Sequence, residues 1–194
     1  MMGWQNKRAF FTFASLPLLG VACLAAASPA SAQARRVVQP PVRIVAGPVR
    51  TLPQILLDRH NLERRAAGVP PLAWDPRLAA SAQAYAVTIS RTGQLVHSPR
   101  QSRPGVAENL WVGSAGAFAP DAGIASWAAE RADYFDGVFP AVSRTGNWLD
   151  VSHYTQMIWR TTTHVGCGLV RSGRWEALVC HYSPKGNRDG QRPR

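Results

Sequence analysis

Downstream of Asp75, apolar side chains recur every three or four positions, the spacing of one face of an α-helix. This apolar stripe consists of Leu78, Ala82, Tyr85 and Ile89. Asp75 can cap the first turn with its carboxylate, and Pro76 suits the first helical position because proline has no backbone N–H to leave unpaired. We therefore predict a helix that begins after Asp75 and buries the stripe.

Three further segments carry helical signals. Residues 52 to 67 precede Gly68, a common residue at the end of a helix. A third helix is predicted after Asp121, with one face formed by Ile124, Trp127, Arg131 and Tyr134. Ser152 is a candidate cap for a short fourth helix that runs to about Trp159.

Two short runs near the C-terminus, 168 to 170 and 175 to 179, have the composition of strands. Between these runs, Gly173-Arg174 suits the two central positions of a type II′ hairpin turn, which would set residue 172 opposite residue 175. Counting outward from this turn places Cys167 opposite Cys180 at a non-hydrogen-bonded pair, where Cα atoms approach to about 4.5 Å. A disulfide can bridge that distance, and closing a loop of this size should contribute roughly 3 kcal/mol. We predict that these two cysteines are bonded.

Residues 108 to 112 add a further strand candidate, and no regular alternation of strands and helices is present. This order favours an α+β domain in which helices cover a small antiparallel sheet. About 160 residues follow the N-terminal apolar segment, which is enough for one domain with a substantial core.

The first 34 residues have the pattern of a secretory signal peptide. Lys7 and Arg8 precede a mostly apolar stretch from residue 9 to residue 27, and small residues near Ala32 and Ala34 offer cleavage sites. The alternative is an uncleaved membrane anchor, because the apolar stretch is long enough to span a bilayer. Export would place the mature protein outside the cell or in the periplasm.

The charge is strongly positive, +11 for the whole chain and +9 without the first 34 residues, which hold two basic and no acidic residues. Arginines gather in residues 35 to 50, which we interpret as an extended basic linker, and in the tail at 191 to 194. A basic exported protein can bind anionic envelope polymers, although the charge can equally serve solubility. No motif for specific nucleic-acid binding is present in the sequence.

Short motifs occur along the rest of the chain. They are His60-Asn61 with Arg64, Pro71-Leu72-Ala73-Trp74, His97-Ser98, Glu108-Asn109-Leu110, Trp127 to Glu130, His153-Tyr154-Thr155-Gln156 with Trp159, Gly166-Cys167-Gly168, and Cys180-His181-Tyr182-Ser183-Pro184 with Gly186-Asn187. In this order they resemble the CAP superfamily, whose SCP domain occurs in cysteine-rich secretory proteins, venom allergens and plant pathogenesis-related proteins. The resemblance covers roughly residues 52 to 190, and we assign residues 51 to 190 to an SCP domain. Ala107 and Ser152 stand where the family usually has glycine.

The resemblance implies an α-β-α sandwich with a central cleft, and it maps the family's cleft residues onto His97, Glu108, Glu130 and His153. Neutral imidazoles are good zinc ligands, and two of them leave coordination positions open for water. The two carboxylates can orient that water or hold the imidazoles. The alternative is a His–Glu network that only stabilises the fold.

Four other polar residues are weaker site candidates, namely His60, Ser98, His164 and His181. His60 is expected to brace the first helix against a loop, and His164 and His181 are expected to be exposed or packed on the sheet. Ser98 lies beside His97, but adjacent residues rarely face each other and no glycine-rich nucleophile elbow surrounds it.

These observations predict an exported, monomeric and non-catalytic protein whose cleft binds a divalent metal, zinc in the first place. By resemblance, its ligand would be a lipid, a sterol-like molecule or a peptide. One alternative is a hydrolase in which Glu108 or Glu130 acts as general base toward metal-bound water. Another is a basic envelope-binding protein whose His–Glu network is purely structural.

Overall fold

The computed structural model describes residues 49 to 194, so the predicted signal peptide and most of the predicted linker lie outside the described residues. Within residues 49 to 194, no helix is both long and apolar enough to cross a membrane.

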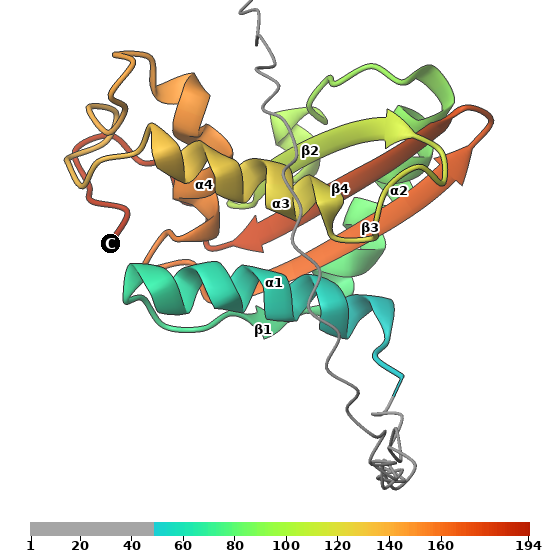
Figure 1. Ribbon diagram of the computed structural model, residues 1–194, viewed down its shortest axis with the longest axis horizontal. Coiled ribbons are helices and arrows are strands. Elements are labelled where there is room, and N and C mark those ends of the chain that lie inside the picture. The colour runs from blue at the N-terminus through green and yellow to red at the C-terminus, as the bar shows by residue number, and fades with distance from the viewer. Residues whose placement is uncertain (1–48) are drawn as a thin grey trace, which may run out of the picture. The chain divides into compact units, whose positions relative to one another are not determined.

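Four strands form one sheet in the order β1-β3-β4-β2, between two layers of helices (Figure 1). The strands are β1 (Ala73–Trp74), β2 (Ala107–Ser114), β3 (His164–Ser172) and β4 (Trp175–Ser183). The helices are α1 (Leu52–Ala67), α2 (Pro76–Thr92), α3 (Ala122–Ala129) and α4 (Ser152–Met157). Short 3₁₀ turns lie at Arg100–Ser102, Glu130–Ala132 and Trp148–Val151. Helix α2 packs on one face of the sheet and α1, α3 and α4 lie over the other, which confirms the α-β-α sandwich.

The predicted start of α2 is confirmed. The Asp75 carboxylate accepts hydrogen bonds from the backbone N–H groups of Arg77 and Leu78, at 2.7 and 3.3 Å. Three residues of the predicted stripe, Leu78, Ala82 and Ile89, are buried, whereas Tyr85 is half-buried and its hydroxyl donates to the Val96 carbonyl. The stripe thus forms the contact between α2 and the sheet.

Helix α2 lies almost directly on the backbone of β3, and two glycines make this approach possible. A Cβ atom on Gly166 would lie 2.1 Å from the Ala79 nitrogen, and one on Gly168 would lie 2.2 Å from the Gln83 Cα. Any side chain at either glycine would therefore push the helix off the sheet. This contact accounts for the Gly-Cys-Gly motif around Cys167.

The C-terminal hairpin has the predicted turn and register. Cys167 pairs with Cys180 across β3 and β4, their Cα atoms are 4.1 Å apart, and their sulfurs are bonded. Both strands are longer than predicted. The sheet is also not wholly antiparallel, because β1 pairs with β3 in parallel, with Ala73 opposite His164.

Two helix predictions need correction. Ser152 does not cap α4: a 3₁₀ turn capped by Asn147 runs directly into the helix, and the Ser152 hydroxyl donates back to the Leu149 carbonyl. Helix α3 ends at Ala129, so Arg131 lies in a 3₁₀ turn and Tyr134 lies beyond it. Ser152 has ordinary helical dihedrals and Ala107 begins a regular strand, so neither position requires glycine.

Arg64 joins α1 to the segment between α4 and β3. Its guanidinium is fully buried and donates hydrogen bonds to four backbone carbonyls. The acceptors are Pro70 at 2.6 Å, Met157 at 2.9 Å, Trp159 at 2.9 Å and Thr162 at 3.0 Å. Burial lowers the pKa of Arg64 to about 10, so the side chain remains charged at neutral pH. One cation therefore binds four carbonyls that lie at the end of α4 or outside regular secondary structure.

Candidate functional site

The carboxylate of Glu108, on β2, is completely buried and binds several donors at once. One oxygen accepts from His97 Nδ1 at 2.8 Å and from the Ser98 backbone N–H at 2.9 Å. The other accepts from the Ser98 hydroxyl at 2.7 Å and from His181 Nε2 at 3.0 Å. The Arg103 guanidinium lies 3.7 Å from the first oxygen. These contacts fasten the loop that carries His97 to the edge of the sheet.

Burial alone would raise the pKa of the Glu108 carboxyl. Hydrogen bonds from His181, His97 and Ser98 stabilise the carboxylate more strongly, and they hold its pKa well below the usual range. Glu108 is therefore a permanent anion at neutral pH, and it accepts a hydrogen bond from the Nδ1–H group of His97. The Nε2 atom of His97 has no hydrogen-bond partner among residues 49 to 194, and 56% of the side chain is exposed.

A second His–Glu pair lies on the other side of β2. His153, in the first turn of α4, donates from Nδ1 to Glu130 at 2.6 Å. The other Glu130 oxygen accepts the backbone N–H groups of His153 and Tyr154, both at 3.0 Å, so the carboxylate also caps α4. The Trp127 ring stacks on the imidazole at 5.8 Å. Nε2 of His153 again has no partner in the described part of the chain.

Both imidazoles line one open cleft of about 840 Å³. Glu108 also lines it, whereas Glu130 does not. The cleft lies at the end of β2, between the His97 loop, the Trp148–Val151 turn with the start of α4, and the segment from Lys185 to Asp189. The structure therefore brings the four predicted residues together as two pairs, His97–Glu108 and His153–Glu130, that flank the same strand.

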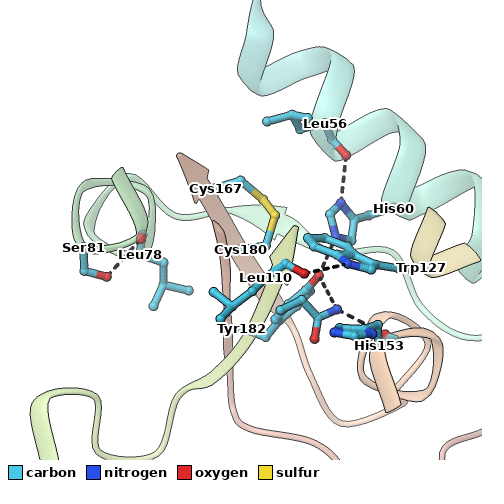
Figure 2. The surroundings of a disulfide bond; sticks show 11 residues. Leu56, His60, Leu78, Ser81, Leu110, Trp127, His153, Cys167, Cys180 and Tyr182 are labelled. Atoms are coloured by element: carbon cyan, nitrogen blue, oxygen red, sulfur yellow. Dashed lines mark hydrogen bonds between the residues drawn. A yellow bond between two sulfur atoms is a disulfide. The ribbon is translucent and has the colours of Figure 1, made fainter. Parts of the chain in front are cut away.

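A buried hydrogen-bond chain runs from α1 to the second pair, as Figure 2 shows around the disulfide. His60 donates from Nδ1 to the Leu56 carbonyl at 2.8 Å, and its Nε2 accepts the Tyr182 hydroxyl at 2.7 Å. The Asn109 amide donates to the same hydroxyl and to the His153 carbonyl, both at 3.2 Å. His60 thus braces α1 against β4, not against a loop as predicted.

His60, Cys167 and Cys180 form the one group of three metal-binding residue types that lie close together in residues 49 to 194. The group is not a metal site. Both sulfurs are joined in the disulfide, which leaves no thiolate, and both nitrogens of His60 are hydrogen-bonded.

Sequence reasoning gave His181 no role, yet it is central to the first pair. It is buried on β4, with Nε2 bonded to Glu108 and Nδ1 2.7 Å from the Ser81 hydroxyl on α2. His181 sits directly opposite Glu108 in the β2–β4 register, and no local sequence signal indicates which strand lies beside β4. His164 is exposed, as expected. The Ser98 hydroxyl donates to a carboxylate and accepts from Arg103, so it is held as a support and not as an activated nucleophile.

Comparison with known proteins agrees with this architecture. Residues 57–182 match the sequence model of CAP, the cysteine-rich secretory protein family. The chain belongs to this family. A PR-1-type pathogenesis-related protein of Sambucus nigra is 38% identical over 143 residues, which cover 73% of this chain and 81% of that protein. Pathogenesis-related leaf protein 4 of Solanum lycopersicum is 37% identical over 142 residues, which cover 73% and 82%.

Solved structures with the same fold include the crystal structure of NaASP2 with Zn2+, at 23% identity and a TM-score of 0.63. That match covers 73% of this chain and 84% of the other. The structure of BmVAL-1 matches at 24% identity and a TM-score of 0.60, covering 77% and 84%. These similarities confirm the fold that the motifs imply for this CAP protein.

The brace at His60 makes this CAP protein sensitive to acid. Burial, and to a smaller extent the Arg64 charge, lower the pKa of His60 to about 4 against the opposing effect of its bond to Leu56. Between pH 6.5 and 4 the unfolded chain binds a proton at this residue and the folded chain does not, so stability must fall as pH falls. This difference between the pKa of His60 in the unfolded and folded chain corresponds to about 3 kcal/mol in the free energy of unfolding.

We expect urea unfolding between pH 7.5 and 4.5 to show this loss in the wild type and a smaller loss in His60→Gln, which cannot titrate. Glu108 does not interfere, because its low pKa makes its own contribution disappear only at more acidic pH. Parallel pH curves for the two proteins would show that the proton does not act at His60.

Proposed function

We propose that the protein is an exported, non-catalytic binding protein whose cleft holds a divalent metal, zinc, between Nε2 of His97 and Nε2 of His153. One observation carries the proposal: both imidazoles line the same cleft, and each donates Nδ1–H to a carboxylate while its Nε2 has no partner among residues 49 to 194. In zinc proteins such carboxylate–histidine pairs fix the ring and its tautomer and make the other nitrogen a better ligand.

The donor set fits an exchangeable ion. Two imidazoles leave coordination positions for water or for a bound ligand, unlike the four protein ligands of a structural zinc site. The bound ion would act as a Lewis acid and draw an oxygen or carboxylate of the ligand to the cleft. Glu108 and Glu130 would support the rings without touching the ion.

The roles of the two carboxylates favour binding over hydrolysis. A general base needs a carboxylate oxygen that can reach metal-bound water and take up its proton. Both Glu108 oxygens are already engaged in a fully buried network, and the low pKa of its carboxyl makes it a poor proton acceptor. Both Glu130 oxygens are engaged by His153 and by the start of α4.

Two further facts support parts of the proposal. The structure of NaASP2, which has the same fold, is a structure with Zn2+, so the fold is compatible with the ion. Export is supported by the signal-like pattern of residues 1 to 34 and agrees with the secretory family. We place the mature monomer outside the cell or in the periplasm, where anionic envelope polymers are available to its positive charge.

Calorimetric titration of zinc into metal-free protein tests the metal site. We expect one zinc per chain at pH 7.5 and much weaker binding at pH 5.5, because a metal binds neutral imidazole nitrogens and protons compete with it for them. Equal affinity at the two pH values would contradict coordination by histidine.

A further inference from the structure

The backbone of Glu108 faces the cleft, and the hairpin register shows this. Hydrogen-bonded and non-bonded pairs alternate outward from the two-residue turn, so Cys167 and Cys180 are a non-bonded pair. The backbone N–H and C=O of Cys180 therefore point away from β3 and toward Asn109 on β2. The N–H and C=O of the next residue, Glu108, consequently point away from the sheet. Strand β2 is an edge strand, so no strand lies there to receive them.

On either side of Glu108, outward-facing backbone groups of this edge already have hydrogen-bond partners. Val106 is satisfied locally, because its N–H donates to the Arg103 carbonyl and its carbonyl accepts from the Arg103 guanidinium at 2.9 Å. The Leu110 carbonyl accepts the Trp127 indole N–H at 3.2 Å, as expected for a group that points outward. Between them, the Glu108 peptide groups have no partner outside the sheet within residues 49 to 194. One open edge position thus lies in the cleft wall.

The same cleft is lined by cations without partners. Arg100, Lys185 and Arg188 are exposed lining residues, and their side chains make no hydrogen bond or ion pair with any described residue. The Arg103 guanidinium is already paired with Glu108 and hydrogen-bonded to nearby carbonyls. Asp189 is the remaining carboxylate of the lining. The unpaired charge of the cleft is therefore positive, and a bound metal would make it more so.

We propose that the ligand is an acidic peptide in extended conformation, which pairs with the Glu108 backbone and places carboxylates near Arg100, Lys185 and Arg188. An extended peptide supplies both a donor and an acceptor to an open strand edge, and guanidinium groups bind carboxylates well. A sugar ligand is less well matched, because the two lining amides that could bind its hydroxyl groups, Gln156 and Asn187, are already hydrogen-bonded within the fold. The inference rests on the cleft of the proposed function but not on its metal.

Fluorescence anisotropy with a labelled hexaglutamate peptide, in EDTA, tests this proposal. We expect measurable binding, and binding about tenfold weaker for the triple variant Arg100→Gln, Lys185→Gln, Arg188→Gln, as three exposed ion pairs would give. A matched triple variant, Arg77→Gln, Arg91→Gln, Arg160→Gln, removes the same charge from exposed positions outside the cleft and should bind as the wild type does.

A hexaglutamate with N-methylated backbone nitrogens keeps its charge but cannot donate to a strand edge, so we expect it to bind several-fold more weakly. Equal binding of the two peptides, or tighter binding of an oligogalacturonate of the same charge, would overturn the peptide assignment. Equal weakening by both triple variants, or no peptide binding at all, would overturn the site. Because EDTA is present, these outcomes are independent of the zinc titration.

Discussion

Replacing both His97 and His153 with alanine should abolish zinc binding, with affinity reduced at least about a hundredfold, since each lost ligand of a metal is more costly than a lost supporting residue. The fold should survive, because one ring is more than half exposed, the other lies at the cleft wall, and neither belongs to the core. Zinc calorimetry at pH 7.5 with a circular dichroism melt measures both effects.

The matched control is His164→Ala, which removes an exposed imidazole outside the cleft and should leave zinc affinity unchanged. Glu130→Gln should have an intermediate effect, about tenfold, because it weakens the hold on the His153 ring without removing a ligand. Undiminished zinc affinity in the double-histidine variant would leave the His–Glu pairs with a purely structural role.

Arg64→Met should be the most destabilising single change considered, about 4 kcal/mol in the free energy of unfolding. Replacing a buried ion pair with apolar residues can be harmless, because both charges disappear together. The partners of Arg64 are instead four backbone carbonyls, which no substitution removes and which methionine cannot satisfy. The lost hydrogen bonds therefore outweigh the relief of burying one charge.

Urea unfolding measures this loss, with Arg65→Met as the control. Arg65 is the next residue of α1 and is exposed, so its replacement removes a charge from the same helix turn without touching the carbonyls. Similar unfolding free energies for the two variants would contradict the role assigned to Arg64.

Local chemistry explains which parts of the fold the sequence predicts. A two-residue turn fixes the hairpin register, and that register alone brings Cys167 and Cys180 together. Asp75 and Pro76 likewise define the start of α2 without help from distant residues. The cap assigned to Ser152 failed because the preceding 3₁₀ turn, which depends on Asn147, cannot be recognised from the serine itself.

Long-range contacts were beyond the sequence. The motifs named His97, Glu108, Glu130 and His153, but only the fold shows which carboxylate supports which ring. His181 was missed because its importance comes from lying opposite Glu108 across two strands 73 residues apart in sequence. The parallel pairing of β1 with β3 joins segments that no turn connects, so no local signal announces it.

The most direct test of the central claim is a crystal structure of the zinc-soaked protein, with an anomalous difference map recorded at the zinc absorption edge. We expect one strong peak in the cleft, about 2.0–2.1 Å from Nε2 of both His97 and His153. The Nδ1 atoms should still be bonded to Glu108 and Glu130. A peak that touches neither Nε2 atom, or no peak at saturating zinc, would contradict it.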